Sequence, residues 1–107
     1  MKRKIIFHKN YFIDFYLGLC NKDQEKIEYV LDMVRNLVWI PQRFFKHLEG
    51  TSGLYEIRVK STDVNYRIFC FFDQGSIVVL LHGFIKKSLR IPKNEIRRAE
   101  KLMKNIF

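Results

Sequence analysis

The sequence contains little cysteine, proline or glycine, with two, two and five of these residues in a chain of 107. So few prolines and glycines argue against a collagen-like chain or a disordered, linker-rich one. Cys20 and Cys70 stand far apart and form neither a CxxC motif nor a cluster with histidines. We therefore expect free thiols, one or both of them in the core, and no metal or cofactor site, because structural zinc needs four regularly spaced ligands.

Long apolar runs are also missing. Lys2, Arg3 and Lys4 resemble the start of a signal peptide, but the segment 5–15 is interrupted by polar residues and offers no apolar centre. An apolar run such as Ile77–Leu81 is far too short to span a bilayer. These absences predict a soluble, cytoplasmic protein that has no membrane partner.

Acidic residues are in the minority, since eleven Asp and Glu face twenty Lys and Arg, which gives a net charge of +9. A basic domain of this size usually binds a polyanion such as RNA, DNA or an acidic protein. The alternative is a solvated basic surface that serves solubility. The chain is 48% hydrophobic and 15% aromatic, which is enough for one core, so we expect a single domain over residues 1–107.

The first half of the chain predicts one strand and two helices. A short strand is expected at 4–8, and a helix follows at 11–19 with Asn10 as its N-cap. A longer helix starts at Asn21 or Asp23 and ends before Pro41. The segment 42–48 is ambiguous and could form one helical turn. The apolar face of the longer helix is expected to contain Ile27, Val30, Leu31, Val34, Leu37 and Val38.

The second half changes to the alternating pattern of strands. Three strands are expected from Leu54 to Lys60, from Tyr66 to Phe72 and from Ile77 to Phe84, with a hairpin turn at 73–76. A last helix begins at Pro92. The element order β-α-α-β-β-β-α predicts an α+β fold, with a small antiparallel sheet packed against helices.

Strand register can be predicted from the two hairpins. If each loop has an even number of residues, the numbers of paired residues sum to 125 in the first hairpin and to 149 in the second. Arg58 then faces Arg67, and Arg67 faces His82, so these residues form one row across three strands. Glu56 and Lys60 share a face with Arg58. A β-bulge in either hairpin would break the row.

Such a row is suited to an anion. Like charges directly opposite each other destabilise a sheet unless an anion lies between them. Guanidinium groups bind phosphate with two parallel hydrogen bonds, and fixed cations stabilise a phosphoryl transition state. Lys86 and Lys87 follow the third of these strands and could lean over the same face. The alternative is that the row is neutralised by surface ion pairs with Glu56, Glu49 and Asp73.

Four sequence blocks resemble one protein family when they are taken in order. They are Gly53–Arg58, Tyr66–Phe69, Leu80–Lys87 and Pro92–Ile96 with Ala99. In this order and spacing they resemble the HigB branch of the RelE/ParE toxins, the branch labelled phage-derived host-growth-inhibition-like. The resemblance implies a RelE-like fold and the toxin of a type II toxin–antitoxin pair. It also implies an endoribonuclease that cuts messenger RNA on the ribosome, in which the ribose 2′-hydroxyl attacks the adjacent phosphate.

The resemblance also implies roles for single residues. Arg58 and Arg67 match the basic strand residues that bind the scissile phosphate, and Lys86 or Lys87 matches the cation at the end of the last strand. Glu56 falls where some relatives carry a lysine. His82, Glu56 or a lysine with a lowered pKa could act as the general base, and the general acid is not identified.

The remaining basic and aromatic residues predict contacts with RNA. Phosphates of ribosomal RNA could be bound by Lys60 and by the last helix, through Lys93, Arg97, Arg98, Lys101 and Lys104. Bases could stack on Tyr55, Phe69 or Phe84. The alternative is that these aromatic side chains pack in the core.

Two other functions fit the same family. ParE-type relatives bind DNA gyrase and do not cut RNA, and an inert RNA-binding domain is also conceivable. The joint presence of Arg58, Arg67, Lys86 and Lys87 favours the nuclease. The expected partners are messenger RNA, the ribosome and an antitoxin from the adjacent gene, either acidic or of the helix-turn-helix type, which covers the cationic sheet or binds elsewhere.

Overall fold

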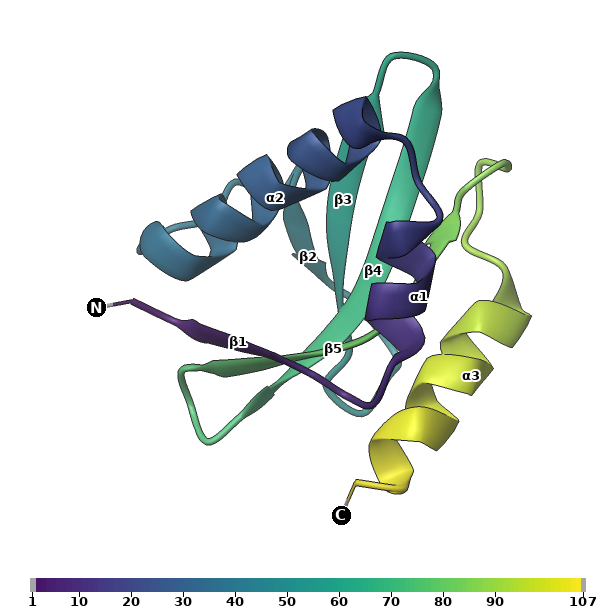
Figure 1. Cartoon of the computed structure of the whole chain (residues 1–107). Helices are drawn as coiled ribbons and strands as arrows, with labels where there is room; N and C mark the ends of the chain where they lie inside the picture. The colour runs from purple at the N-terminus through teal and green to yellow at the C-terminus, as the bar shows by residue number, and fades with distance from the viewer. Residues whose placement is uncertain (1, 107) are drawn as a thin grey trace.

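The computed structural model describes residues 2–106 and arranges five strands in one sheet (Figure 1). The spatial order is β1-β5-β4-β3-β2, and the strands β2 to β5 run antiparallel to their neighbours. The first strand instead joins β5 in parallel, so the sheet is mixed and not wholly antiparallel as expected. The strands are β1 (Lys4–Phe7), β2 (Phe45–His47), β3 (Tyr55–Ser61), β4 (Val64–Asp73) and β5 (Ile77–Ile85).

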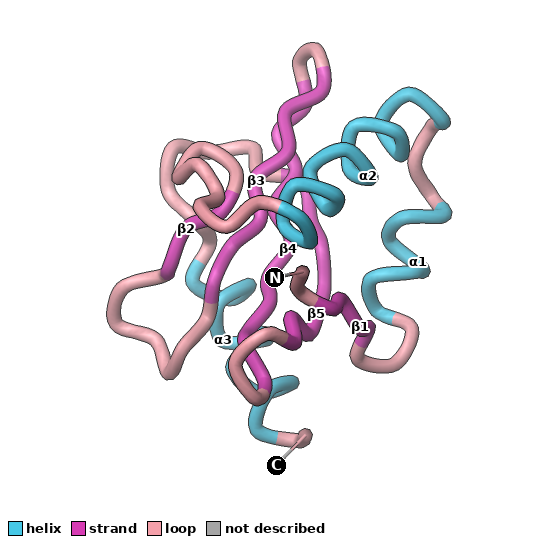
Figure 2. Tube along the Cα trace, turned by 90° about the vertical axis from the view of Figure 1, so that its left-hand side faces the viewer, coloured by secondary structure: helices cyan, strands magenta, loops and turns pink. Residues whose placement is uncertain are grey.

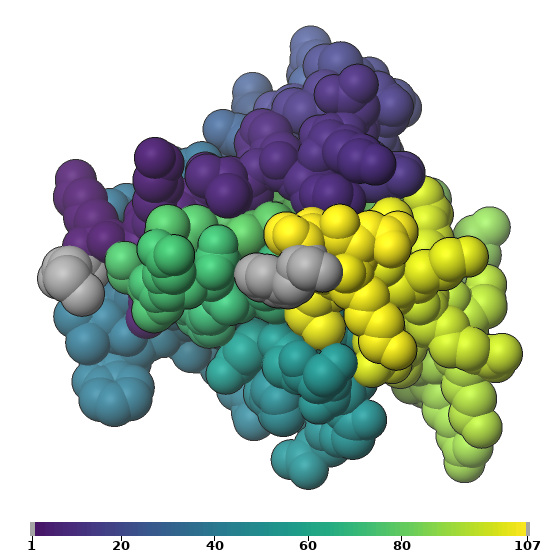
Figure 3. Space-filling view, turned by 90° about the horizontal axis from the view of Figure 1, so that it is seen from below, coloured from purple at the N-terminus to yellow at the C-terminus, as the bar shows by residue number. Residues whose placement is uncertain are grey.

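Helices pack on both faces of the sheet (Figure 2), and the predicted packing of a sheet against helices is confirmed. On one face, α1 (Tyr11–Leu17) and α2 (Asn21–Asn36) enclose a core with Ile57, Ile68 and Leu80. On the other face, α3 (Lys93–Lys104) packs on a second apolar cluster that contains Phe69 and Phe84. Seen from below, α3 lies between the purple N-terminal segment and the teal loop before β3 (Figure 3).

The apolar stripe of α2 is confirmed only over its first part. Ile27, Val30, Leu31 and Val34 are buried, but the helix ends at Asn36, ahead of the expected boundary. Leu37 then adopts an extended conformation, so Leu37 and Val38 leave the stripe and are exposed. Neither Asn21 nor Asp23 caps the helix, since the N-cap position is held by Cys20, which is exposed, whereas Cys70 lies in the core.

A polar network fastens the start of α2 to the sheet. The carboxylate of Asp23 accepts hydrogen bonds from the hydroxyls of Ser61 on β3 and Tyr66 on β4. Burial and the bond to Asp23 raise the pKa of Tyr66 to about 12, so its hydroxyl remains protonated and donates. Asp23 therefore acts as a bridge between helix and sheet and not as a cap.

We expect Tyr66→Phe to lower the free energy of unfolding by about 1 kcal/mol, because it removes one buried hydrogen bond and little apolar contact. Urea denaturation followed by circular dichroism would measure this change. Tyr29→Phe is the matched control, because the Tyr29 side chain is exposed on α2 and should leave the midpoint unchanged. An equal loss in both variants would contradict a specific role for the Asp23–Tyr66 bond.

The ambiguous segment 42–48 contains one turn at 42–44 and then a strand, so the suggested helical turn describes only its first part. A turn closes where the amide groups of Phe44 and Phe45 donate to the carbonyl of Pro41. Strand β2 then pairs with β3, with Phe45 opposite Ile57. Proline fixes its own φ and starts a turn readily, and the aromatic residues that follow favour an extended chain.

The register prediction is confirmed in the first hairpin and wrong in the second. Arg58 lies opposite Arg67, as expected. Between β4 and β5, Cys70 pairs with Leu80 but Ile68 pairs with Gly83, so one residue of β4 faces two of β5. The hairpin loop is also odd, because Asp73 pairs with Ile77 and leaves the three residues 74–76 between them. The odd loop and the β-bulge each shift the pairing by one residue, so Arg67 faces Phe84 instead of His82.

Across residues 2–106, none of the helices combines the length and the apolar character that a bilayer-spanning segment requires.

Candidate functional site: a cationic pocket on the sheet

Three residues form a row across neighbouring strands of the sheet, and Phe44, in the turn before β2, extends this row through its backbone. Arg58 on β3 pairs with Arg67 on β4, which in turn pairs with Phe84 on β5. On the other side, the Arg58 amide donates to the carbonyl of Phe44 at 2.8 Å, so Phe44 extends the row. The two arginines therefore lie side by side with an aromatic residue at each end.

The arginines line an open pocket of about 310 Å³. It lies on the sheet face that also carries α3, because the alternate residues Ile57, Val59 and Ile68 point into the core beneath α1 and α2. The apolar cluster under α3 covers the other part of this face. The pocket is lined by Arg43, Phe44, Arg58, Lys60, Asn65 and Arg67.

A buried carboxylate holds the two arginines together. Glu56 is 1% exposed, and its Oε1 atom accepts a hydrogen bond from Arg58 Nε at 2.7 Å. Its Oε2 atom lies 3.6 Å from Arg67 Nε. Among the described residues, the side-chain hydrogen bonds of Arg58 engage only Nε, which leaves its terminal nitrogens for a ligand. Glu56 therefore orients the guanidinium groups without closing the pocket, because their side chains remain 28% and 14% exposed.

The pocket keeps an excess of positive charge. Arg43, Arg58, Lys60 and Arg67 line it, and Glu56 neutralises one of these four charges, so three remain. Burial lowers the pKa of Arg67, Glu56 opposes this shift and Arg58 adds to it. A guanidinium stays protonated in proteins, and the result is a desolvated cation that would gain from an anionic ligand.

The alternative of internal neutralisation is only partly realised. Glu56 does pair with both arginines, but over residues 2–106 no ion pair joins Glu49 or Asp73 to them. One carboxylate between two guanidinium groups neutralises only one of their two positive charges, so a net positive charge remains. The arrangement is that of an anion-binding site with its cations already oriented.

His82 does not belong to this row. It is 1% exposed beneath α3, where its Nε2 lies 3.2 Å from Glu95 Oε1 and its ring contacts Phe69 and Phe84. Burial lowers the pKa of His82, the positive charge of Arg98 lowers it further, and Glu95 opposes both. The ring is therefore enclosed away from the pocket, and its candidacy as general base is not supported by its position.

Neither of the two lysines after β5 lines the pocket, although Lys86 lies next to it. The Lys86 ammonium donates to the carbonyls of Ser88 at 2.6 Å and Leu89 at 3.2 Å, which orders the loop after β5. Its backbone amide donates to the carbonyl of Asn65, one of the lining residues. Lys87 is exposed. Of the predicted phosphate contacts outside the row, only Lys60 lines the pocket.

Comparison with known sequences identifies a family. Residues 14–104 match the family described as phage-derived Gp49-like proteins. The chain belongs to this Gp49-like family. Among solved structures, the Gp49-like chain is similar to a chain in the crystal structure of the archaeal RelE–RelB complex from Pyrococcus horikoshii OT3. The match has a TM-score of 0.58 and 20% identity and covers 85% of this chain and 100% of the other, so the fold is RelE-like. A search of curated proteins found no match.

The aromatic residues expected to stack on bases are placed elsewhere in the Gp49-like protein. Phe69 and Phe84 are buried against each other and against the apolar side of α3. Tyr55 lies on the opposite face of the sheet, where its ring contacts Phe45 and Phe72. The core-packing alternative is therefore correct for these residues. The aromatic side chain in the pocket is Phe44, which the sequence reasoning missed.

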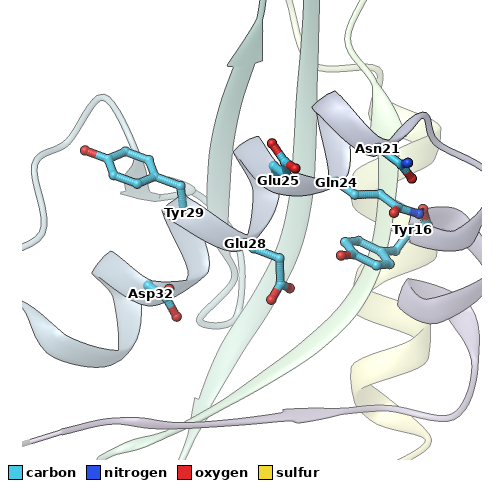
Figure 4. Close-up of a pocket in the computed structure, with 7 residues that line it drawn as sticks. All are labelled: Tyr16, Asn21, Gln24, Glu25, Glu28, Tyr29 and Asp32. Atoms are coloured by element: carbon cyan, nitrogen blue, oxygen red, sulfur yellow. The ribbon is translucent and has the colours of Figure 1, made fainter.

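The basic and acidic surfaces of the Gp49-like protein lie on different helices. Exposed cations project from α3 at Lys93, Arg97, Arg98, Lys101 and Lys104, and Arg98 also lies 5.6 Å from the centre of the Tyr11 ring. A separate hollow along α2 is acidic instead (Figure 4). It is lined by Glu25, Glu28 and Asp32 with Tyr16, Tyr29, Asn21 and Gln24. A polyanion would therefore approach the sheet and α3 and avoid α2.

Proposed function

We propose that this Gp49-like protein is the toxin of a type II toxin–antitoxin pair and cleaves messenger RNA on the ribosome, as the HigB resemblance implies. The observation that carries the proposal is the pair of neighbouring guanidinium groups of Arg58 and Arg67, oriented by Glu56 at an open pocket. The RelE-like fold and the Gp49-like family are consistent with it.

In the proposed reaction, the ribose 2′-hydroxyl attacks the adjacent phosphorus. The new 2′ P–O bond forms as the bond to the 5′-oxygen of the next nucleotide breaks, which leaves a cyclic phosphate and a 5′-hydroxyl end. The 2′-hydroxyl loses its proton to a base, and the leaving 5′-oxygen takes up one proton, from water or an acidic group, so the step balances. Negative charge grows on the phosphoryl oxygens in the transition state. Arg58 and Arg67 stabilise that charge, and their desolvated, preorganised positions make them more effective than mobile surface cations. Because these side chains supply the charge stabilisation, the proposal requires no metal ion.

The other predicted residues take supporting roles in this proposal. Glu56 orients the arginines through its bond to Arg58 Nε and acts as a positioning residue. Lys60 lines the pocket and would bind a phosphate of the message. Lys86 and Lys87 would contact the backbone beyond the pocket. We do not assign the proton transfers to His82, since Glu95 and the α3 cluster enclose it.

The decisive experiment maps messenger 5′ ends in cells that express the protein with and without the product of the neighbouring gene. We expect new 5′-hydroxyl ends within translated frames, and we expect the neighbouring gene product to suppress them. DNA breaks with intact messages would instead identify a gyrase-directed toxin. Intact messages and intact DNA, with RNA still bound, would identify an inert RNA-binding domain.

The cations of α3 are expected to anchor the protein to ribosomal RNA. Arg97→Gln and Lys101→Gln each remove one exposed charge, so the logarithmic salt dependence of ribosome binding should become less steep by about one per lost phosphate contact. Sedimentation with ribosomes over a range of salt concentrations would measure this slope. Lys26→Gln, on α2, is the matched control and should leave the slope unchanged.

A further inference from the structure

The pocket contains more than a phosphate site needs. An inorganic anion is bound by charges and hydrogen-bond donors alone, but this pocket is also lined by Phe44. Phe44 is half-buried, since it packs against the edge of the core under α2 and also lines the pocket. A flat apolar surface beside several cations matches the chemistry of a nucleotide, which has an aromatic base attached to an anionic backbone.

Phe44 is held in a fixed place relative to the arginines. The Pro41 turn and the bond from the Arg58 amide to the Phe44 carbonyl set its backbone directly beside Arg58. Neighbouring strands lie about 4.8 Å apart, so the Phe44 backbone lies about one strand spacing from Arg58 and two from Arg67. A phosphate on the two arginines would therefore bring an attached base toward Phe44 and not toward Phe84, which is buried at the other end of the row.

Arg43 already shows that this ring accepts a planar partner. Its guanidinium carbon lies 4.8 Å from the centre of the Phe44 ring, and Arg43 itself is exposed. Because Arg43 is exposed, its side chain can swing away from the Phe44 ring and let a base stack there. The guanidinium group can then stack on the outer face of that base, as guanidinium groups do on aromatic side chains. Phe44 and Arg43 contact each other at the lining of the cationic pocket, and a base could enter between them only when the Arg43 side chain moves away from the ring.

We propose that Phe44 and Arg43 form a stacking clamp that holds the nucleobase adjacent to the phosphate bound by Arg58 and Arg67. This inference rests on the proposed function, because it assumes that the pocket binds RNA. Every base has an aromatic face, so the clamp increases affinity for single-stranded RNA with little preference for sequence. Phe44 and Arg43 are binding and positioning residues, and the charge stabilisation stays with Arg58 and Arg67.

The clamp can be tested without cleavage and without ribosomes. The full chain is titrated with a fluorescent 2′-O-methyl trinucleotide, which cannot be cut because the attacking hydroxyl is blocked. We expect Phe44→Leu to weaken binding about tenfold, since it keeps an apolar side chain but loses the flat ring. Phe44→Trp should bind as well as the unaltered chain or better. Tyr29→Leu, on the acidic side of α2, is the matched control and should have no effect.

A trinucleotide that lacks its bases distinguishes stacking from a structural effect. The unaltered chain and Phe44→Leu should bind this abasic probe equally, because only the phosphate contacts remain. If Phe44→Leu weakens both probes alike, or neither, the clamp is refuted. Arg67→Ala should weaken both probes, and its loss of messenger cleavage is a separate result. The binding titration tests the clamp, and the mapping of messenger 5′ ends tests the proposed function. Failure of one experiment therefore leaves the result of the other intact.

Discussion

Arg67→Ala should reduce messenger cleavage about 10²- to 10³-fold and abolish toxicity, while the protein still folds. Arg67 is the more buried of the two arginines that Glu56 contacts, with a side chain 14% exposed, and it lies opposite Arg58. Its removal takes away half of the cationic pair that would face the scissile phosphate. The measurement is the rate at which new 5′-hydroxyl ends appear in a ribosome-programmed cleavage assay.

The fold should survive this change because Glu56 keeps its closer partner, Arg58 Nε at 2.7 Å. Arg58→Ala should also inactivate the protein, but it leaves the buried Glu56 carboxylate without that bond and should cost about 1.5–3 kcal/mol of stability as well. Arg67 is therefore the cleaner test of the site.

Arg35→Ala is the matched control, because it removes an exposed guanidinium on α2 whose ion pair with Asp32 contributes little. It should leave cleavage and toxicity unchanged. Full toxicity of Arg67→Ala would mean that the cationic pocket is not the site of the reaction. Equal inactivation by Arg35→Ala would mean that loss of any positive charge, and not this pocket, explains the result.

Ile68→Asp should prevent folding, with a loss of more than about 4 kcal/mol. Ile68 is fully buried on β4, one residue from Arg67, in the core that the sheet forms with α1 and α2. An aspartate there would bury a charge, and no cation belongs to that apolar cluster. Circular dichroism and urea denaturation would show the loss of a cooperative transition.

Ile68→Val is the matched control and should cost about 0.5–1.5 kcal/mol, since it removes one methylene group and introduces no polar atom. The contrast between positions 67 and 68 tests the strand alternation on which the site depends. A soluble, cooperatively folded Ile68→Asp variant would show that this side chain does not point into the core.

Local patterns in the sequence were enough to predict most of the elements and one half of the central row. Alternation along β3 and β4 and a short turn between them determine that Arg58 faces Arg67, because the register of a tight hairpin depends on its own residues. The buried stripe from Ile27 to Val34 follows in the same way from helical periodicity. These features depend on neighbours that are close in the chain.

The position of His82 depends on the bulge in β5 and on packing between distant segments, which the alternation of apolar residues in the sequence does not reveal. A bulge places two residues of β5 opposite Phe69, and Gly83 next to it faces α1. A Cβ atom at Gly83 would lie 2.5 Å from the Phe15 ring, so glycine at this position permits the close packing of α1 on the sheet. That packing joins segments far apart in the chain. The even-loop register failed here for two reasons: the loop between Asp73 and Ile77 has three residues, and the bulge adds one further residue on β5.

What the sequence by itself determined is the basic α+β domain, the pairing of Arg58 with Arg67 and the face that they share with Glu56 and Lys60. Only the tertiary structure decided which neighbours complete the site. It buried His82 under α3, placed Glu56 between the guanidinium groups, and brought Phe44 beside Arg58 through β2. The physical reason is that hydrophobic periodicity and turn residues determine structure over only a few neighbouring residues. Burial and ion pairing instead depend on which distant segments pack together.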